Sequence, residues 1–273
     1  MAFGQEARTA LMVWRRELIR FGRNPVRAVT SFIQPLLFLF VLGTGLSKVV
    51  QTGAGGPSYQ QYLFPGIVAM NIITTSIFSG VSIVWDREFG FLREMLVAPV
   101  SRASIILGKV LGGAVVATLQ GAVMLVMAPL VGVRLTVLVV VEFVLGAFLM
   151  AASLTSFGVF VAARMKKMES FQVVMQVVLF PMIFLAGVMF PLRGLPAWLT
   201  VLTRLNPLTY AVDPLRHIVL AAQGTSAVAG GTPLAGGVDV FGHLLAPWEE
   251  FLVVAGFAAV FLSLAIASFS KTE

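Results

Sequence analysis

The sequence contains no cysteine, and only 11% of its 273 residues are charged. The absence of cysteine excludes disulfides, thiolate catalysis and Cys-ligated metals. Soluble domains carry about 25% charged residues, so this chain has too little polar surface to fold in water alone. Hydrophobic residues make up 58% of it, and the mean hydropathy is +0.95. The composition therefore predicts an all-α polytopic membrane protein.

Sequence motifs typical of catalysis and of ATP hydrolysis are also missing. There is no phosphate loop, because Gly108-Lys109 is followed by Val and lacks the first glycine of the motif. There is no H-E-x-x-H or G-x-S-x-G pattern, and His217 and His243 lie 26 residues apart. We expect no catalytic residue, metal site or cofactor in this chain. An ion-coupled secondary carrier remains the alternative function, although such carriers usually show buried acids or broken central helices.

Six stretches are long and apolar enough to cross a membrane, which takes about 20 mainly apolar residues. They are residues 26–46, 62–84, 105–131, 137–163, 171–190 and 250–269. Fourteen of the nineteen Lys and Arg residues fall on the side of the two termini. The positive-inside rule therefore places both termini in the cytoplasm. The net charge of +7 then belongs to cytoplasmic loops rather than to a nucleic-acid surface, and we expect a plasma membrane, such as a bacterial inner membrane.

Two segments outside the spans have patterns of their own. Residues 5–23 predict a basic amphipathic helix with Trp14 in its apolar face, lying in the membrane interface; the alternative is a disordered basic tail. Residues 191–222 contain two apolar stretches around Asn206-Pro207, each too short to span, which predict a re-entrant or interfacial hairpin on the outer side. The glycine-rich residues 223–247 predict an irregular outer loop.

Polar residues within the spans are few and clustered. Such residues face other helices rather than lipid, because lipid offers them no partner. Their side chains either form hydrogen bonds between helices or line a substrate route, and both interpretations stay open. The candidates for the route are Gln34, Asn71, Thr74, Thr75, Gln172 and Gln176. Gly108 and Gly112 have the spacing that permits close helix packing.

An island of charge interrupts the apolar sequence at residues 86–102, where six of seventeen residues are charged. Each central Asp, Lys or Arg costs about 2.5–3.5 kcal/mol in a bilayer, so the island must lie outside the hydrocarbon. Phe89, Leu92 and Leu96 form an apolar stripe among charges of both signs. This mixture favours a helix that contacts a soluble partner. The alternative is a solvated loop with stop-transfer charges.

Three segments together resemble the ABC-2-type transporter permeases, in particular the daunorubicin-resistance and NodJ-like branch. They are the island continued to Lys109, Phe190-Pro-Leu-Arg-Gly-Leu-Pro-Ala-Trp-Leu199, and Asn206-Pro-Leu-Thr-Tyr-Ala-Val-Asp-Pro-Leu-Arg216. Their order and spacing cover nearly the whole chain. The resemblance does not extend to the loop at residues 223–247.

The resemblance implies a single transmembrane domain over residues 1–273 that acts as half of an exporter of a drug-like, lipid or lipid-linked saccharide solute. It implies two separate ABC ATPase subunits, which bind the ATP and Mg. It also implies a second permease subunit, either another copy that forms a homodimer or a paralogue, and a role in multidrug resistance. The island would be the coupling helix that docks on the ATPase; its contact residues would be Arg87, Glu88, Phe89, Leu92, Arg93, Glu94 and Pro99. We expect an outer gate at Asn206, Pro207, Tyr210, Asp213 and Arg216.

Overall fold

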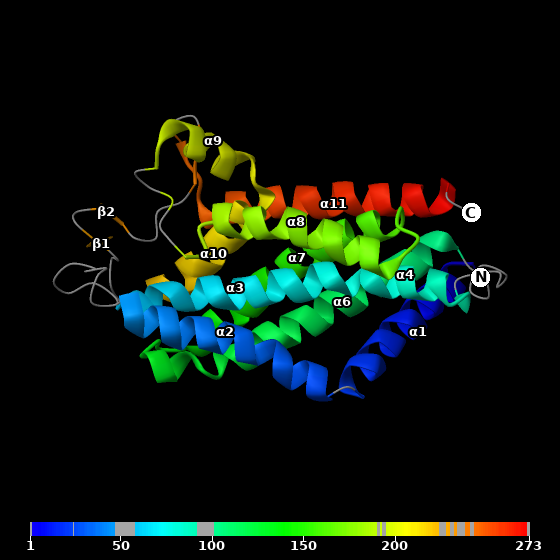
Figure 1. Cartoon of the computed structure of the whole chain (residues 1–273), viewed down its shortest axis with the longest axis horizontal. Helices are drawn as coiled ribbons and strands as arrows, with labels where there is room; N and C mark the ends of the chain where they lie inside the picture. The colour runs from blue at the N-terminus through cyan, green and yellow to red at the C-terminus, as the bar shows by residue number, and fades with distance from the viewer. Residues whose placement is uncertain are drawn as a thin grey trace.

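The computed structural model describes residues 2–23, 25–46, 58–91, 101–189, 192, 195–223, 228–229, 232–233, 238–240 and 243–271. These residues form an elongated helical bundle with both termini at one end (Figure 1). The long helices are α1 (Ala2–Gly22), α2 (Pro25–Leu46), α3 (Tyr59–Ser79), α6 (Arg102–Leu125), α7 (Val137–Ala162), α8 (Met168–Leu185) and α11 (Pro247–Lys271). The shorter ones are α4 (Val81–Glu88), the 3-10 helix η1 (Ala128–Val131), α9 (Ala197–Leu205) and α10 (Pro207–Ala221).

Five helices of the described chain are long and apolar enough to span a membrane. They are the nearly continuous α3 and α4 (Tyr59–Glu88), α6, α7, α8 and α11; α2 contributes a shorter apolar stretch, Val29–Gly45. The predicted all-α polytopic architecture is thereby confirmed. Most helix boundaries differ from those expected by a few residues, and two of these differences are examples. The helix of the third span ends at Leu125 and is followed by η1, and the last helix already begins at Pro247.

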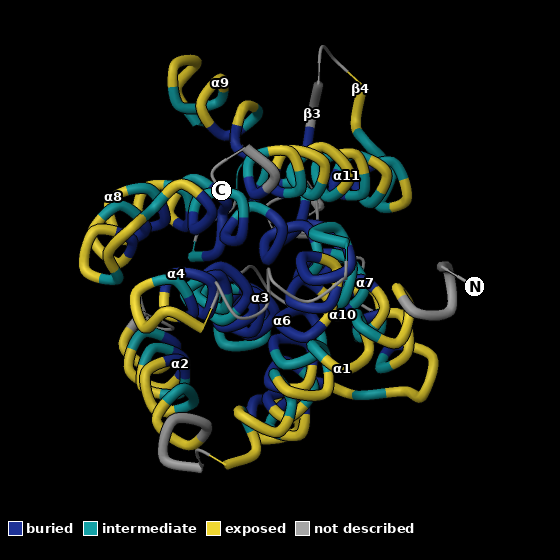
Figure 2. Tube along the Cα trace, turned by 90° about the vertical axis from the view of Figure 1, so that its right-hand side faces the viewer, coloured by how far each residue is buried: buried dark blue, intermediate teal, exposed yellow. Residues whose placement is uncertain are grey.

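Close contacts between small residues hold the centre of the bundle together. At Gly80, where α3 ends, an added Cβ atom would lie 2.6 Å from the carbonyl carbon of Gly158 on α7. At Gly113 of α6, an added Cβ would lie 2.8 Å from the side chain of Thr155 on α7. Only glycine permits backbones to approach so closely. Figure 2 shows the resulting core at the centre, with exposed faces of α2, α8 and α11 turned outward.

The predicted amphipathic N-terminal segment is helical, as α1, and it meets α2 at an angle (Figure 1). It packs against α6 through Ala10, Val13 and Glu17. Leu11 and Met12 are 61% and 69% exposed, so α1 presents an apolar side away from the bundle. A helix that is packed on one side and apolar on another suits the membrane interface. That location stays a prediction.

The segment between α8 and α11 lies at the end of the bundle opposite the termini (Figure 1). Its two short helices, α9 and α10, are separated at Asn206, as the sequence predicts. In the predicted irregular loop, β1 (Val228–Ala229) pairs antiparallel with β2 (Thr232–Pro233), with Val228 opposite Pro233. In the same way, β3 (Asp239–Val240) pairs with β4 (His243–Leu244), with Asp239 opposite Leu244.

Candidate functional site

The charged island begins in α4, an eight-residue helix that continues the line of α3 at the end of the bundle that carries the termini. Gly80 keeps helical backbone angles and passes the chain from α3 into α4. Gly90 follows α4 with φ of 82°, a left-handed conformation that glycine adopts without strain. We call the contacts of α4 with α1, α6, α7 and α8 the α4 junction.

A cluster of ion pairs joins α4 to α6 and α1. The ammonium of Lys109 lies 2.6 Å from Oδ2 of Asp86 and donates a hydrogen bond of 3.1 Å to Ser82. Arg16 of α1 donates to the same Asp86 oxygen at 2.9 Å, and Glu17 lies 3.6 Å from the Lys109 ammonium. Lys109 is only 2% exposed and Asp86 7%. Buried charges of this kind are retained only when they are paired and hydrogen-bonded.

The pKa of Arg16 reports the same attraction. Desolvation by burial works to lower it, but the charge of Asp86 and its hydrogen bond, with help from Glu17, raise the pKa above its ordinary value. Arg16 therefore stays protonated, and its positive charge holds α1 to α4.

Arg87 and Glu88 of α4 bind the connection between α7 and α8. The Arg87 guanidinium donates to the carbonyl oxygens of Met165 and Ala163 at 2.6 and 3.0 Å, where α7 ends. A positive charge and donors at this position satisfy the free carbonyls of a helix C-terminus. Glu88 accepts a 3.2 Å hydrogen bond from the backbone N–H of Met168, the first residue of α8. A negative charge is favoured at a helix N-terminus.

An aromatic pair extends the α4 junction outward. The guanidinium carbon of Arg20 on α1 lies 4.6 Å from the centre of the Trp85 ring, a cation–π contact. Trp85 meets Phe89 edge to face at 5.6 Å, and its indole N–H points to the sulfur of Met168. Phe89 itself is 66% exposed. The end of α4 therefore carries an apolar residue that the described chain leaves uncovered.

The predicted coupling residues fall into three groups. Arg87 and Glu88 bond to the ends of α7 and α8, Arg87 from a half-buried position and Glu88 from an exposed one. Phe89 is directed outward. The remaining four lie outside the described residues: Leu92, Arg93, Glu94 and Pro99.

Sequence reasoning did not assign roles to Arg16, Trp85 and Lys109. The available signal was Lys109 itself, because a lysine within an apolar helix requires a carboxylate partner. The sequence does not identify which acid that is, because Glu94 and Glu88 lie nearer to Lys109 than Asp86, its partner in the structure.

Among the predicted pathway residues, Asn71 and Thr75 form hydrogen bonds between helices. The Asn71 amide donates to the Ser31 carbonyl of α2 at 2.8 Å, and the Thr75 hydroxyl donates to Gln120 of α6. The Gln120 amide in turn donates to the Ser31 hydroxyl at 3.1 Å. Thr74 bonds within its own helix, to the Met70 carbonyl. These bonds connect α2, α3 and α6.

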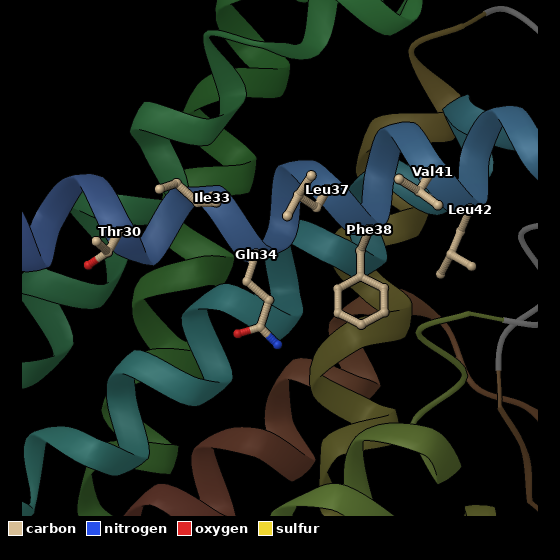
Figure 3. Close-up of a pocket in the computed structure, with 7 residues that line it drawn as sticks. All are labelled: Thr30, Ile33, Gln34, Leu37, Phe38, Val41 and Leu42. Atoms are coloured by element: carbon tan, nitrogen blue, oxygen red, sulfur yellow. The ribbon is translucent and has the colours of Figure 1, made fainter.

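The three glutamines of the predicted pathway lie on open faces. Gln34 contributes to a groove of about 570 Å³ along α2, and it projects from the same side of the helix as Phe38 (Figure 3). Gln172 and Gln176 are exposed on α8. The other residues that line the groove are Thr30, Ile33, Leu37, Val41 and Leu42. The groove is therefore apolar, with two polar side chains.

Two of the predicted outer-gate residues fix the break between α9 and α10. The Asn206 side chain accepts from the N–H of Leu208 at 3.2 Å, which caps α10, and donates to the Met182 carbonyl of α8 at 2.7 Å. Pro207 occupies the first helical position of α10, where its missing N–H is not needed. The Tyr210 hydroxyl donates to the Arg204 carbonyl of α9 at 2.7 Å.

Arg216 is a buried cation at the same end. It is 2% exposed, its guanidinium donates to the carbonyls of Gly187 and Val188, and its carbon lies 4.5 Å above the ring of Tyr62 on α3. Arg216 thus connects α10 to the end of α8 and to α3. Asp213 is also buried, and it lies 3.3 Å from His217 one turn later in α10.

Comparisons with known proteins agree on one family. The sequence profile of the ABC-2 type transporter matches residues 9–220. Transport permease ycf38 of Cyanophora paradoxa is 30% identical over 209 residues, covering 75% of this chain and 71% of that protein. Nodulation protein J of Rhizobium leguminosarum bv. trifolii is 30% identical over 215 residues, covering 77% and 80%. The matched region includes about two thirds of α1, the α4 junction and nearly all of α10.

Proposed function

The chain belongs to the ABC-2 type transporter family, and we propose that it is the membrane subunit of an exporter driven by separate ABC ATPase subunits. The family membership makes the chain a subunit of membrane transport. Its ATPase partners, the direction of transport and the nature of the solute are our proposals.

The observation that carries the ATPase coupling is the α4 junction. The short helix α4 carries Arg87 and Glu88, the first of the predicted coupling residues, and it precedes the other five. It is bonded to four other helices. Lys109 and Arg16 bind Asp86, and the neighbouring Arg87 and Glu88 bind the ends of α7 and α8. A displacement of the coupling segment would therefore move α1, α6, α7 and α8 together. A loop that only stops membrane insertion has no need of such contacts.

The groove on α2 supports a hydrophobic or amphipathic solute. Its lining is apolar apart from Thr30 and Gln34, and ligand sites commonly combine apolar walls with a few polar groups that orient the ligand. The groove is open and formed by one helix, so it does not enclose a solute by itself. A second permease copy facing α2 and the exposed glutamines of α8 would close it. We therefore propose a dimeric permease with Gln34, Gln172 and Gln176 along the route.

The outer gate is proposed at α9 and α10. Asn206 and Arg216 connect α10 to α8 and α3, so α10 can follow movements of the spanning helices. At the opposite end, α8 is bonded to the α4 junction and α3 continues into α4. Movement begun at the coupling segment would reach the outer end through α8.

Reconstitution with the partner tests the proposal. The chain is purified with a candidate ABC ATPase subunit, placed in liposomes, and screened for solutes that stimulate ATP hydrolysis and are transported. An ATPase variant without its phosphate-loop lysine is the control, and it should abolish transport. Transport that continues with this variant and follows a proton gradient would instead support the ion-coupled carrier.

A further inference from the structure

Three metal-ligating side chains converge between α10 and α11, at the end opposite the α4 junction. Asp213 and His217 lie one turn apart on α10, and Glu250 lies in the first turn of α11. Their donor atoms all lie within 4.8 Å of one another. Asp213 is 4% exposed and Glu250 is fully buried. Separate helices thus bring two carboxylates and an imidazole into one buried space.

The carboxylates are incompletely satisfied by the rest of the described chain. One oxygen of Glu250 accepts a 3.2 Å hydrogen bond from the N–H of Val238, but its Oε2 has no hydrogen-bond partner among the described residues. The same holds for Oδ2 of Asp213, which lies 3.3 Å from Nδ1 of His217 and close to the Glu250 carboxylate. The hydrogen bonds found for Arg216 within the described chain go to the carbonyls of Gly187 and Val188 and not to these carboxylates. Two buried carboxylates with free oxygens are costly unless a cation or a proton joins them.

We propose that Asp213, His217 and Glu250 bind a divalent transition metal of the Zn²⁺ class. Imidazole nitrogen with carboxylate oxygen suits zinc and its neighbours, whereas Mg²⁺ and Ca²⁺ prefer oxygen ligands throughout. Three protein ligands leave a fourth position for water or a solute group. The metal neutralises both carboxylates and joins α10 to α11. This site differs from our sequence-based expectation of no metal in the chain, because the sequence does not reveal that Glu250 meets α10.

Metal titration of the purified full chain tests the site. The protein carries a tag without histidine, is treated with EDTA, and is then titrated with ZnCl₂ and with CoCl₂ alone. We expect one equivalent of metal, visible Co²⁺ absorption bands, and imidazole scattering in X-ray absorption of the zinc-loaded wild type. His217→Gln and Glu250→Gln should weaken binding by more than the 10–100-fold that loss of an outer-shell partner typically costs.

The chain supplies a matched control in its second histidine. His243 is exposed and also lies 3.3 Å from a carboxylate, that of Glu249, so His243→Gln should leave metal binding unchanged. Size-exclusion elution and thermal unfolding without metal verify that each variant is folded. Absence of stoichiometric uptake by the wild type overturns the proposal, and then a proton shared by the two carboxyl groups remains. Equal binding by wild type and a folded His217→Gln variant also overturns it.

Discussion

Asp86 and Lys109 form a buried ion pair of 2.6 Å between α4 and α6. Asp86 is the first residue of the charged island, and Lys109 lies about two turns inside α6. Arg16 adds a third helix to the same carboxylate at 2.9 Å. The island therefore has an anchored end at Asp86, in addition to its predicted free surface for a partner. Substitutions at these residues can therefore test how the anchoring contributes to stability.

Breaking the pair from one side should destabilise the protein more than removing both charges. Asp86→Asn or Lys109→Met each leaves a buried charge without its main partner, which typically costs about 3–5 kcal/mol. The double variant leaves no such charge, and we expect its cost to fall short of the sum by about 0.5–3 kcal/mol. Thermal unfolding in detergent measures all three. Arg8→Met, at an exposed position of α1, is the control. Additive effects would contradict the coupling.

Replacing Gly108 should release α1 from α6. A Cβ atom there would lie 2.6 Å from the Ala10 carbonyl oxygen and 2.7 Å from the Val13 Cβ, so even Gly108→Ala forces the helices apart. We expect faster trypsin cleavage at the arginines of α1, together with reduced transport. Gly256→Ala is the matched control, because an added Cβ there meets nothing within 4 Å. Equal cleavage of both variants would show that the contact is dispensable.

The same glycine shows where prediction from sequence succeeds and where it stops. The spacing of Gly108 and Gly112 predicts close packing, but it does not name the partner, which is α1. Apolar runs and the positive-inside count depend on local composition, so the helices and the break at Asn206 follow from them. The partner of Lys109 lies 23 residues away. Glu250 of α11 lies close to Asp213 of α10, although the two are 37 residues apart in the sequence. Such pairs depend on tertiary packing, which local patterns do not encode.

The hydrogen bonds of single residues add to what the sequence predicts of them. Asn71 and Thr75 are predicted as pathway or interhelical residues, and their hydrogen bonds to α2 and α6 favour the second role. Arg87 and Glu88 are predicted at the ATPase interface, yet their charged groups bind the ends of α7 and α8. A charged residue in a sequence does not reveal whether it faces a partner or a helix terminus of its own chain.

Charge reversal at Arg93 and Glu94 should uncouple transport from ATP hydrolysis. Both residues lie outside the described part of the chain, so this prediction depends on the sequence and on the anchored helix before them. Arg93→Glu with Glu94→Arg preserves net charge while reversing the expected contacts. Solute-stimulated ATPase activity of the reconstituted complex is the measurement, and we expect its loss with unchanged membrane insertion. Reversal of Glu6 and Arg8, which are exposed on α1, provides the control. Normal stimulation would count against a coupling role.

Arg216 should not tolerate replacement by lysine. Its guanidinium reaches two carbonyls and covers the Tyr62 ring, and an ammonium cannot reproduce this planar geometry. We expect Arg216→Lys to lower the unfolding temperature in detergent. Tyr62→Phe, which keeps an aromatic face, should be milder than Tyr62→Leu. Arg164→Lys is the comparison. The guanidinium carbon of Arg164 lies 4.5 Å from the centre of the Phe160 ring, at the C-terminal end of α7. If Tyr62→Leu and Tyr62→Phe were equally stable, the ring would not contribute.

Labelling of single cysteines should place the two ends of the bundle on opposite sides of the membrane. The chain has no cysteine, so each introduced one is unique. Leu205 at the end of α9 is 74% exposed and Phe89 at the end of α4 is 66% exposed, which makes both suitable positions. The positive-inside rule predicts that a membrane-impermeant maleimide added outside intact cells labels Leu205→Cys and not Phe89→Cys. Permeabilised cells should give labelling of both, which verifies that Phe89→Cys is reactive. Labelling of Phe89→Cys in intact cells would show a topology opposite to the predicted one. The charged island would then lie outside the cell, where a cytoplasmic ATPase cannot contact it.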